Sequence, residues 1–273
     1  MIDFSNLDPY APMVRLAYVP GTAGDNILLG LKGVKRLPVH KSPHLLVSYA
    51  YIKKWITTRH QAVYKDWIMD SGAHTVEHSG GKVDLVKYTE FCQEMLATDP
   101  RLTEVIALDV ISDWRQGMKN FEYMWRHGVP AIPTWHYGEP VSVLKELNKL
   151  FPYKMCLGGI SNAGFSQKKK IELAKMVFKE VWPMRVHGLA IQGERALLAV
   201  PWHSTDAANW TLGTGRYGTW ASYGKLRIRK KVHNLEIEID HYKKLEIKAQ
   251  HRWRSVWEKA AKLLPAWPIR EMP

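Results

Sequence analysis

The stretch Trp67-Ile-Met-Asp70-Ser71-Gly72 shows the pattern that decides the fold, a short apolar run that ends in a polar residue. Similar runs end at Leu108-Asp109-Val110, at Gly158-Gly159-Ile160 and at Ser204-Thr205-Asp206. Short, continuous apolar runs are typical of strands in a parallel sheet that is covered on both faces. In α/β barrels, polar residues at the carboxyl ends of such strands form the active site. The pattern therefore predicts a parallel barrel whose mouth holds several carboxylates.

Eight short apolar runs are strand candidates, and eight is the number of strands in a closed barrel of this kind. They are Val14–Val19, Leu45–Tyr51, Trp67–Asp70, Val105–Val110, Ala131–His136, Met155–Gly159, Val186–Ile191 and Leu197–Pro201. Amphipathic helical patterns separate several of them, clearest in Leu85–Ala97, Trp114–Arg126, Val141–Leu150 and Lys168–Val181. This alternation predicts an α/β fold, a TIM-like (β/α)8 barrel, with a doubly wound open sheet as the alternative.

The size and composition of the chain fit one large domain, because 273 residues, 46% of them hydrophobic, can bury a single core. No apolar stretch approaches the roughly 20 residues that a membrane span needs. The first residues also lack the basic and then apolar pattern of a secretion signal. We therefore expect a cytoplasmic protein. Cys92 and Cys156 lie far apart in the sequence, so we expect buried thiols rather than a disulfide or a zinc site.

The strong positive charge of the chain indicates a polyanionic partner. The formal net charge is +13 and the pI is about 9.6, and excess Lys and Arg binds nucleic acid through counterion release. DNA or RNA is the first expectation and an anionic membrane surface the second. After Asp206 a Trp- and Gly-rich stretch precedes the basic run Lys225–Lys231, and Leu235–Leu264 is helical in pattern. We expect the barrel in residues 1–221 and a basic, mostly helical extension packed on it in residues 222–273.

Six motifs carry a resemblance to a known family through their order and spacing. They are Met69-Asp-Ser-Gly72, Leu108-Asp-Val110, Ile132-Pro-Thr-Trp-His136, Leu157-Gly-Gly-Ile160, Val186-His-Gly-Leu-Ala-Ile191 and Ser204-Thr-Asp-Ala-Ala-Asn-Trp210. Together they resemble the guanine transglycosylases with the tRNA-type barrel. The similarity is greatest to the phage and bacterial branch that inserts 7-deazaguanine bases into DNA. That branch implies a bacterial cytoplasm, or the cytoplasm of a phage-infected host.

The resemblance implies a role for each carboxylate. Asp206 matches the nucleophile that attacks the sugar C1′, and Asp70 matches the acid/base residue that protonates the departing guanine. Asp109 matches the carboxylate that accepts from the N1–H and N2–H2 groups of guanine. The other expected base-binding residues are His136, Gly158, Gly159, Ser71, Gly72 and Gln192.

Structural explanations for several of these residues stay open. Asp70 in Asp-Ser-Gly could be a turn former, and Asp206 could cap a helical turn. Asp113 could read guanine, although it also fits the N-cap before Trp114. For His74, His78, His187 and His203 a structural, hydrogen-bonded role is expected.

The tRNA-acting enzymes carry a Cys-x-Cys-x-x-Cys and His zinc site after the nucleophile, and nothing after Asp206 matches it. No metal is therefore expected, and a tRNA target is in doubt. Instead we expect DNA phosphates to bind Arg216, Lys225, Arg227, Arg229, Lys230 and Lys231. The aromatic residues Trp210, Tyr217, Trp220 and Tyr223 are expected to support the strand.

The predicted function is a DNA-guanine transglycosylase that needs no cofactor. It would exchange guanine in DNA for a free 7-deazaguanine base, such as 7-cyano-7-deazaguanine, through a covalent aspartyl-deoxyribosyl intermediate. One alternative is the same chemistry on RNA. Another is a barrel hydrolase with a divalent metal on Asp70, Asp109, His136 and Asp206, and a third is a non-catalytic basic DNA-binding barrel.

Overall fold

The computed structural model describes residues 12–264 except 79, 112, 152, 161–163, 192, 209, 212–218, 224–225 and 231–234. Within residues 219–230, the description covers the backbone of the two strands only. The same holds for residue 78, whose side chain is not described.

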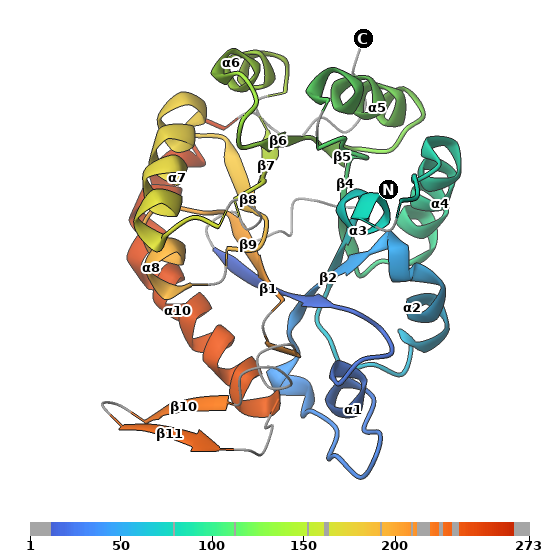
Figure 1. Ribbon diagram of the computed structural model, residues 1–273, viewed down its shortest axis with the longest axis vertical. Coiled ribbons are helices and arrows are strands. Elements are labelled where there is room, and N and C mark those ends of the chain that lie inside the picture. The colour runs from blue at the N-terminus through green and yellow to red at the C-terminus, as the bar shows by residue number, and fades with distance from the viewer. Residues whose placement is uncertain are drawn as a thin grey trace.

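Nine parallel strands form one sheet among the described residues. They are β1 Met13–Tyr18, β2 His44–Ser48, β3 Trp67–Asp70, β4 Leu102–Ile106, β5 Ala131–Ile132, β6 Thr134–His136, β7 Lys154–Gly158, β8 Arg185–Gly188 and β9 Ser204–Ala207. Their order is β5-β4-β3-β2-β1-β9-β8-β7-β6. The strands curl into a nearly closed barrel inside a ring of helices (Figure 1). The fold is thus α/β with a nearly closed parallel barrel, which is compatible with the predicted TIM-like architecture.

The two edges of this sheet belong to one stretch of chain. β5 and β6 are separated only by Pro133, and they pair with β4 and β7 respectively. The Pro133 carbonyl accepts from the Cys156 amide at 2.8 Å. The run Ala131–His136, predicted as a single strand, therefore bridges both edges of the sheet.

The last predicted strand is wrong. Leu197–Pro201 begins at the end of a short helix, α8 Glu194–Leu197, and continues as a turn, whereas the strand β9 is Ser204–Ala207. Trp202 lies fully buried beneath that turn and donates its indole N–H to the Ala196 carbonyl at 3.0 Å. Short apolar runs do not distinguish a strand from a buried turn. The true strand was missed because its inward-facing residues are polar.

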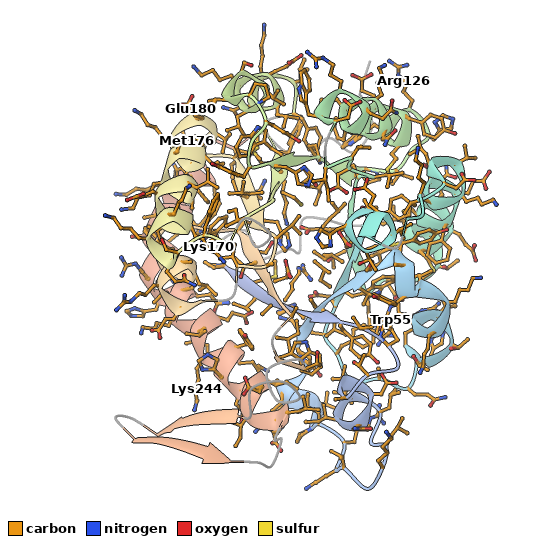
Figure 2. The ribbon with its side chains drawn as sticks, in the orientation of Figure 1. Trp55, Arg126, Lys170, Met176, Glu180 and Lys244 are labelled. Atoms are coloured by element: carbon orange, nitrogen blue, oxygen red, sulfur yellow. The ribbon has the colours of Figure 1, made fainter. Side chains whose placement is uncertain are left out.

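The predicted helices are confirmed with small shifts at their ends. They are α4 Leu85–Thr98, α5 Trp114–Arg126, α6 Val141–Leu150 and α7 Gln167–Val181; shorter helices are α1 Gly24–Leu28, α2 Ile52–Thr58 and α3 Ala73–His78, with 3-10 turns η2 Val39–Lys41 and η3 Tyr49–Tyr51. Asp113 caps α5 by accepting from the Gln116 amide at 3.2 Å, which explains this residue without a role in base recognition. The helices cover the outside of the sheet, where Lys170 and Glu180 mark α7 and Lys244 marks α10, Leu235–Ala260 (Figure 2).

The long helix α10 Leu235–Ala260 packs against β1 and α1. Its buried residues Leu235, Ile239, Tyr242, Leu245 and Ala249 share one core cluster with β1. β10 Thr219–Tyr223 and β11 Leu226–Lys230 pair with each other as an antiparallel hairpin, separate from the nine-stranded sheet. The expected boundary between residues 221 and 222 falls inside β10. None of the described helices is long and apolar enough to cross a membrane.

The barrel interior is layered. Because side chains alternate along a strand, Leu46 faces inward while Leu45 and Val47 pack against the outer helices. An apolar layer of Leu46, Ile68, Ile106, Ile132 and Cys156 fills the middle. The same alternation places Asp70, His136, Gly158 and Asp206 on the inner face, toward the carboxyl ends of the strands.

Candidate active site

Four titratable side chains converge at the carboxyl end of the barrel. Asp70 ends β3, Asp109 follows β4, His136 ends β6 and Asp206 lies within β9. Asp70 and Asp109 are partly exposed, whereas Asp206 and His136 are 5% exposed each. Asp70 and Asp206, which are 136 positions apart in the sequence, thus lie at the same mouth of the barrel, as the strand-end pattern predicted. Asp206 is a strand residue, so the helix-capping alternative does not apply to it.

The surroundings of Asp70 favour the protonated form of its carboxyl group. Burial raises the pKa of Asp70, and the negative charges of Asp109 and Asp206 raise it further, to about 7. Hydrogen bonds from the Gly72 amide, at 3.0 Å, and from the Ser48 hydroxyl act in the opposite direction. The turn-forming contact expected of Asp-Ser-Gly is therefore present, and the carboxyl group is also poised to give or take a proton near neutral pH.

Gly72 is required by the shape of this turn. Its φ is +77°, and an added Cβ would lie 2.8 Å from the Ser48 hydroxyl and 2.9 Å from the Ala50 amide. A side chain there would strain the backbone and displace Ser48 from Asp70. The observed role of Gly72 is thus to shape the turn that holds Ser48 beside Asp70, and its predicted contact with a base stays a prediction.

Asp109 is oriented by partners on both oxygens. Ser71 donates to its Oδ1 at 2.8 Å, and His136 Nε2 lies 2.9 Å from its Oδ2. The other imidazole nitrogen, Nδ1, lies 3.3 Å from Glu139 Oε1. Burial alone lowers the pKa of His136, but hydrogen bonds to Asp109 and Glu139, and their charges, raise it to about 9. His136 is therefore a buried cation at neutral pH.

This arrangement changes the expected role of His136. Both ring nitrogens are engaged by carboxylates, so its predicted contact with the base would need one of these bonds to open. Asp109 keeps unused lone pairs on both oxygens, because a carboxylate can accept about four hydrogen bonds. The geometry fits a site in which His136 and Ser71 fix Asp109 and Asp109 receives the ligand.

Gly158 and Gly159 make room for this histidine. A Cβ on Gly158 would lie 2.7 Å from His136 Cδ2, and one on Gly159 would lie 3.1 Å from the Tyr137 amide. Gly159 also has a φ of +79°. Close approach of the backbone is thus observed, but toward His136 and Tyr137; approach to a base stays a prediction.

Asp206 is held by contacts from the neighbouring strand β8 and from the loop that follows it. The Ala190 amide donates to its Oδ1 at 2.7 Å, and His187 Nε2 lies 3.6 Å from the same oxygen. Ala190 has a φ of +58°, which is uncommon for a residue with a side chain. Such strain costs about 1 to 2 kcal/mol and often marks functional sites. Oδ2 carries no such partner among the described residues, so one oxygen is held and the other is available.

Sequence reasoning did not assign roles to Ser48, Glu139 and Ala190. Ser48 ends β2 beside Asp70, and strand-end position was the signal that could have found it. Glu139 follows His136 by three residues, a spacing that carries no chemistry until a turn brings the side chains together. Ala190 acts through its backbone, which leaves no signature in residue type.

Several predicted residues are not placed by the structure. Gln192, Arg216, Tyr217, Lys225 and Lys231 lie outside the described residues. Arg227, Arg229 and Lys230 belong to β11, and Trp220 and Tyr223 to β10, but their side chains lie outside the described part. Their contacts with nucleic acid stay predictions.

Trp210 was wrongly expected to support a nucleic-acid strand. It is fully buried, packs against Tyr18 and donates its indole N–H to the Ala17 carbonyl at 2.8 Å. A buried indole has no face for a base, so Trp210 is part of the core. Cys92 and Cys156 are buried free thiols, as predicted.

An exposed aromatic group lies next to the site. Tyr137 directly follows His136, is 43% exposed and meets Phe165 edge-on, with ring centroids 4.7 Å apart. The Lys169 ammonium lies 4.2 Å from the centre of the Phe165 ring, at the start of α7. Aromatic faces with adjacent cations are a common way to hold single-stranded nucleic acid.

In the part of the chain that the structure describes, no three His, Cys, Asp or Glu side chains are arranged to hold a metal ion. Comparisons of the sequence with protein-family models and with curated proteins gave no match.

Proposed function

We propose that this protein is a DNA-guanine transglycosylase that replaces guanine in DNA with a 7-deazaguanine base. The observation that carries the proposal is the carboxylate cluster at the barrel mouth, in which a carboxyl group that favours its proton lies among two other aspartates. Base exchange at a sugar carbon needs a nucleophilic carboxylate and a proton carrier. The motif resemblance assigns these roles to Asp206 and Asp70.

The first half-reaction forms a covalent intermediate. Oδ2 of Asp206 attacks C1′ of the deoxyribose while the bond between C1′ and guanine N9 breaks, with oxocarbenium-like character in the transition state. Asp70 transfers its proton to the departing base and becomes a carboxylate. The products of this step are the aspartyl-deoxyribosyl ester and neutral guanine.

The second half-reaction reverses these steps with another base. The Asp70 carboxylate takes the N9 proton of the incoming 7-deazaguanine, whose N9 attacks C1′ as the ester bond to Asp206 breaks. Two displacements at the same carbon retain the sugar configuration. Asp70 is again protonated, so the enzyme returns to its starting state without an external acid or base.

Asp109 supplies base selectivity in this proposal. Guanine and 7-deazaguanine share the N1–H and N2–H2 donors, and a carboxylate accepts both at once. Adenine presents an acceptor at N1 and no amino group at C2, so it would leave Asp109 without donors. Ser71 and His136 keep the Asp109 oxygens in place for this pairing.

DNA is proposed as the polymer because of charge and access. The net charge of +13 favours a polyanion, and Tyr137 with Lys169 offers a stacking and phosphate-binding surface beside the site. A base must leave the duplex to reach a barrel mouth. An exposed aromatic at the mouth would stabilise the strand around the extruded nucleotide.

The test is exchange of isotopically labelled guanine into duplex DNA and, in parallel, into tRNA. We expect label in DNA, none in tRNA, and none in either with Asp206→Ala, while DNA binding by that variant is unchanged. Label in tRNA alone would overturn DNA as the substrate and keep the chemistry. Near-normal exchange by Asp206→Ala would refute the nucleophile, and DNA binding without exchange would favour a binding protein.

A further inference from the structure

The strongest unexplained feature is a buried hydrogen-bond chain that runs through the barrel interior to Asp206. Lys154 Nζ lies 2.6 and 2.7 Å from the two carboxylate oxygens of Glu104 and 3.5 Å from the Ser204 hydroxyl. The Ser204 hydroxyl lies 2.8 Å from His187 Nδ1. All four side chains are buried, with exposures of 5% or less. Four different strands contribute these residues.

We propose that this chain makes His187 a positioning residue for Asp206, by fixing the imidazole proton on Nε2, the nitrogen that faces Asp206 Oδ1. The proposal rests on the proposed role of Asp206 as nucleophile. The Nε2 atom is buried, lies 3.6 Å from Oδ1 and has no hydrogen-bond partner among the described residues. A buried polar atom without a partner is rare and calls for an explanation.

The groups at the two ends of this hydrogen-bond chain, Lys154 and Asp206, decide which atoms in it donate and which accept. A lysine ammonium has three donors and no acceptor, so the Ser204 oxygen accepts from Lys154. The Ser204 oxygen has two lone pairs, so this contact alone would let His187 Nδ1 either donate or accept. A proton on Nδ1 would leave the bare Nε2 lone pair facing the Asp206 carboxylate oxygen at 3.6 Å, so we infer that the Ser204 hydroxyl donates to Nδ1. A neutral imidazole that accepts at one nitrogen carries its proton on the other. Nε2–H is therefore directed at Asp206.

His187 stays neutral in this environment. Burial lowers the pKa of His187, and the charges of Lys154 and Arg15 lower it further, against the opposing effect of Asp206. A neutral donor orients a carboxylate without neutralising it, which preserves its nucleophilicity. Together with the Ala190 amide, Nε2–H would hold Oδ1 and turn Oδ2 toward the sugar. Catalytic hydrogen bonds are often long before the substrate binds.

Two matched variants separate this role from a packing role. In His187→Gln the amide nitrogen can occupy the place of Nε2, whereas in His187→Asn the amide reaches only the place of Nδ1. We expect His187→Asn to lower kcat for exchange by about 10- to 100-fold, the loss typical of one hydrogen bond to a charged group. KM for DNA should change less than threefold, and His187→Gln should recover most of kcat. Equal losses in both variants, or none in either, would overturn the proposal.

The proton position can be tested without activity. In ¹⁵N spectra of the wild-type protein, with the His187 signals assigned by their loss in His187→Gln, we expect the proton on Nε2. Asp206→Ala should shift that signal. A proton on Nδ1, or an Nε2 signal that does not change in Asp206→Ala, would refute the proposed hydrogen-bond directions. If the wild type shows no base exchange but carries its proton on Nε2 beside Asp206, the proposed function fails while the hydrogen-bond chain stands.

Discussion

Replacement of Asp70 by Asn should stabilise the protein while abolishing base exchange. The structure raises the pKa of Asp70 from an ordinary 3.8 to about 7, through burial and the charges of Asp109 and Asp206. The folded protein therefore binds this proton more tightly than the unfolded chain. Stability is lost as pH rises from about 4 to 7, because the carboxyl group must ionise in an unfavourable place. An amide has no charge to bury and can still accept from the Gly72 amide.

The magnitude follows from linkage. A pKa shift of this size lowers the free energy of unfolding of the wild-type protein by about 4 kcal/mol when Asp70 is fully ionised. Part of it has developed by pH 5, so the free energy of unfolding of Asp70→Asn relative to wild type should rise by about 2.5 kcal/mol between pH 5 and 8. Above pH 8 the difference should level off. The expected gain is a substantial fraction of the free energy of unfolding of a typical domain, which is about 5 to 15 kcal/mol.

The assay is chemical denaturation of both proteins at each pH unit from 5 to 9. The comparison requires that the free energy of unfolding depends on denaturant concentration with the same slope in both proteins. In an Asp109→Asn background the rise should be smaller, because the charge of Asp109 contributes to the shift. A stability difference that does not depend on pH would refute the raised pKa. Unchanged exchange by Asp70→Asn would separately refute the acid/base role.

Three further outcomes are expected. Since Asp70 must be protonated for the first half-reaction, kcat/KM for DNA should fall about tenfold per pH unit above 7; a flat profile to pH 9 would exclude Asp70 as the acid. Gly158→Ala should reduce exchange at least tenfold because its Cβ would lie 2.7 Å from the His136 imidazole, which orients Asp109, the carboxylate proposed to bind the base. Gly117→Ala, whose Cβ would lie 3.6 Å from its nearest neighbour, should be neutral in the same assay. Tyr137→Ala and Lys169→Ala should both weaken DNA binding, but only the lysine variant should reduce the slope of log affinity against log salt, by about one; equal slopes would argue against a phosphate contact.

The sequence by itself determined the helices and most of the strands, because these follow from local periodicity. Residues 114–126 and 141–150 form helices with the predicted bounds. Strand-end polarity also located Asp70 and Asp109 correctly, since the carboxyl ends of parallel strands meet on one side of a barrel. These features need only neighbouring residues and the direction of the chain.

Tertiary structure alone decided what those residues can do. The pKa of Asp70 depends on the charges of Asp109, which follows β4, and of Asp206 in β9. Glu139 became a partner of His136 only through the turn after β6. β9 was misplaced because its inner face is polar, which is favourable only where Lys154 and His187 from other strands satisfy it. Trp210 changed from an expected surface platform to a core residue once Tyr18 and Ala17 enclosed it. Protonation, burial and hydrogen bonding depend on groups far apart in the chain, and only the nearly closed barrel brings them within reach.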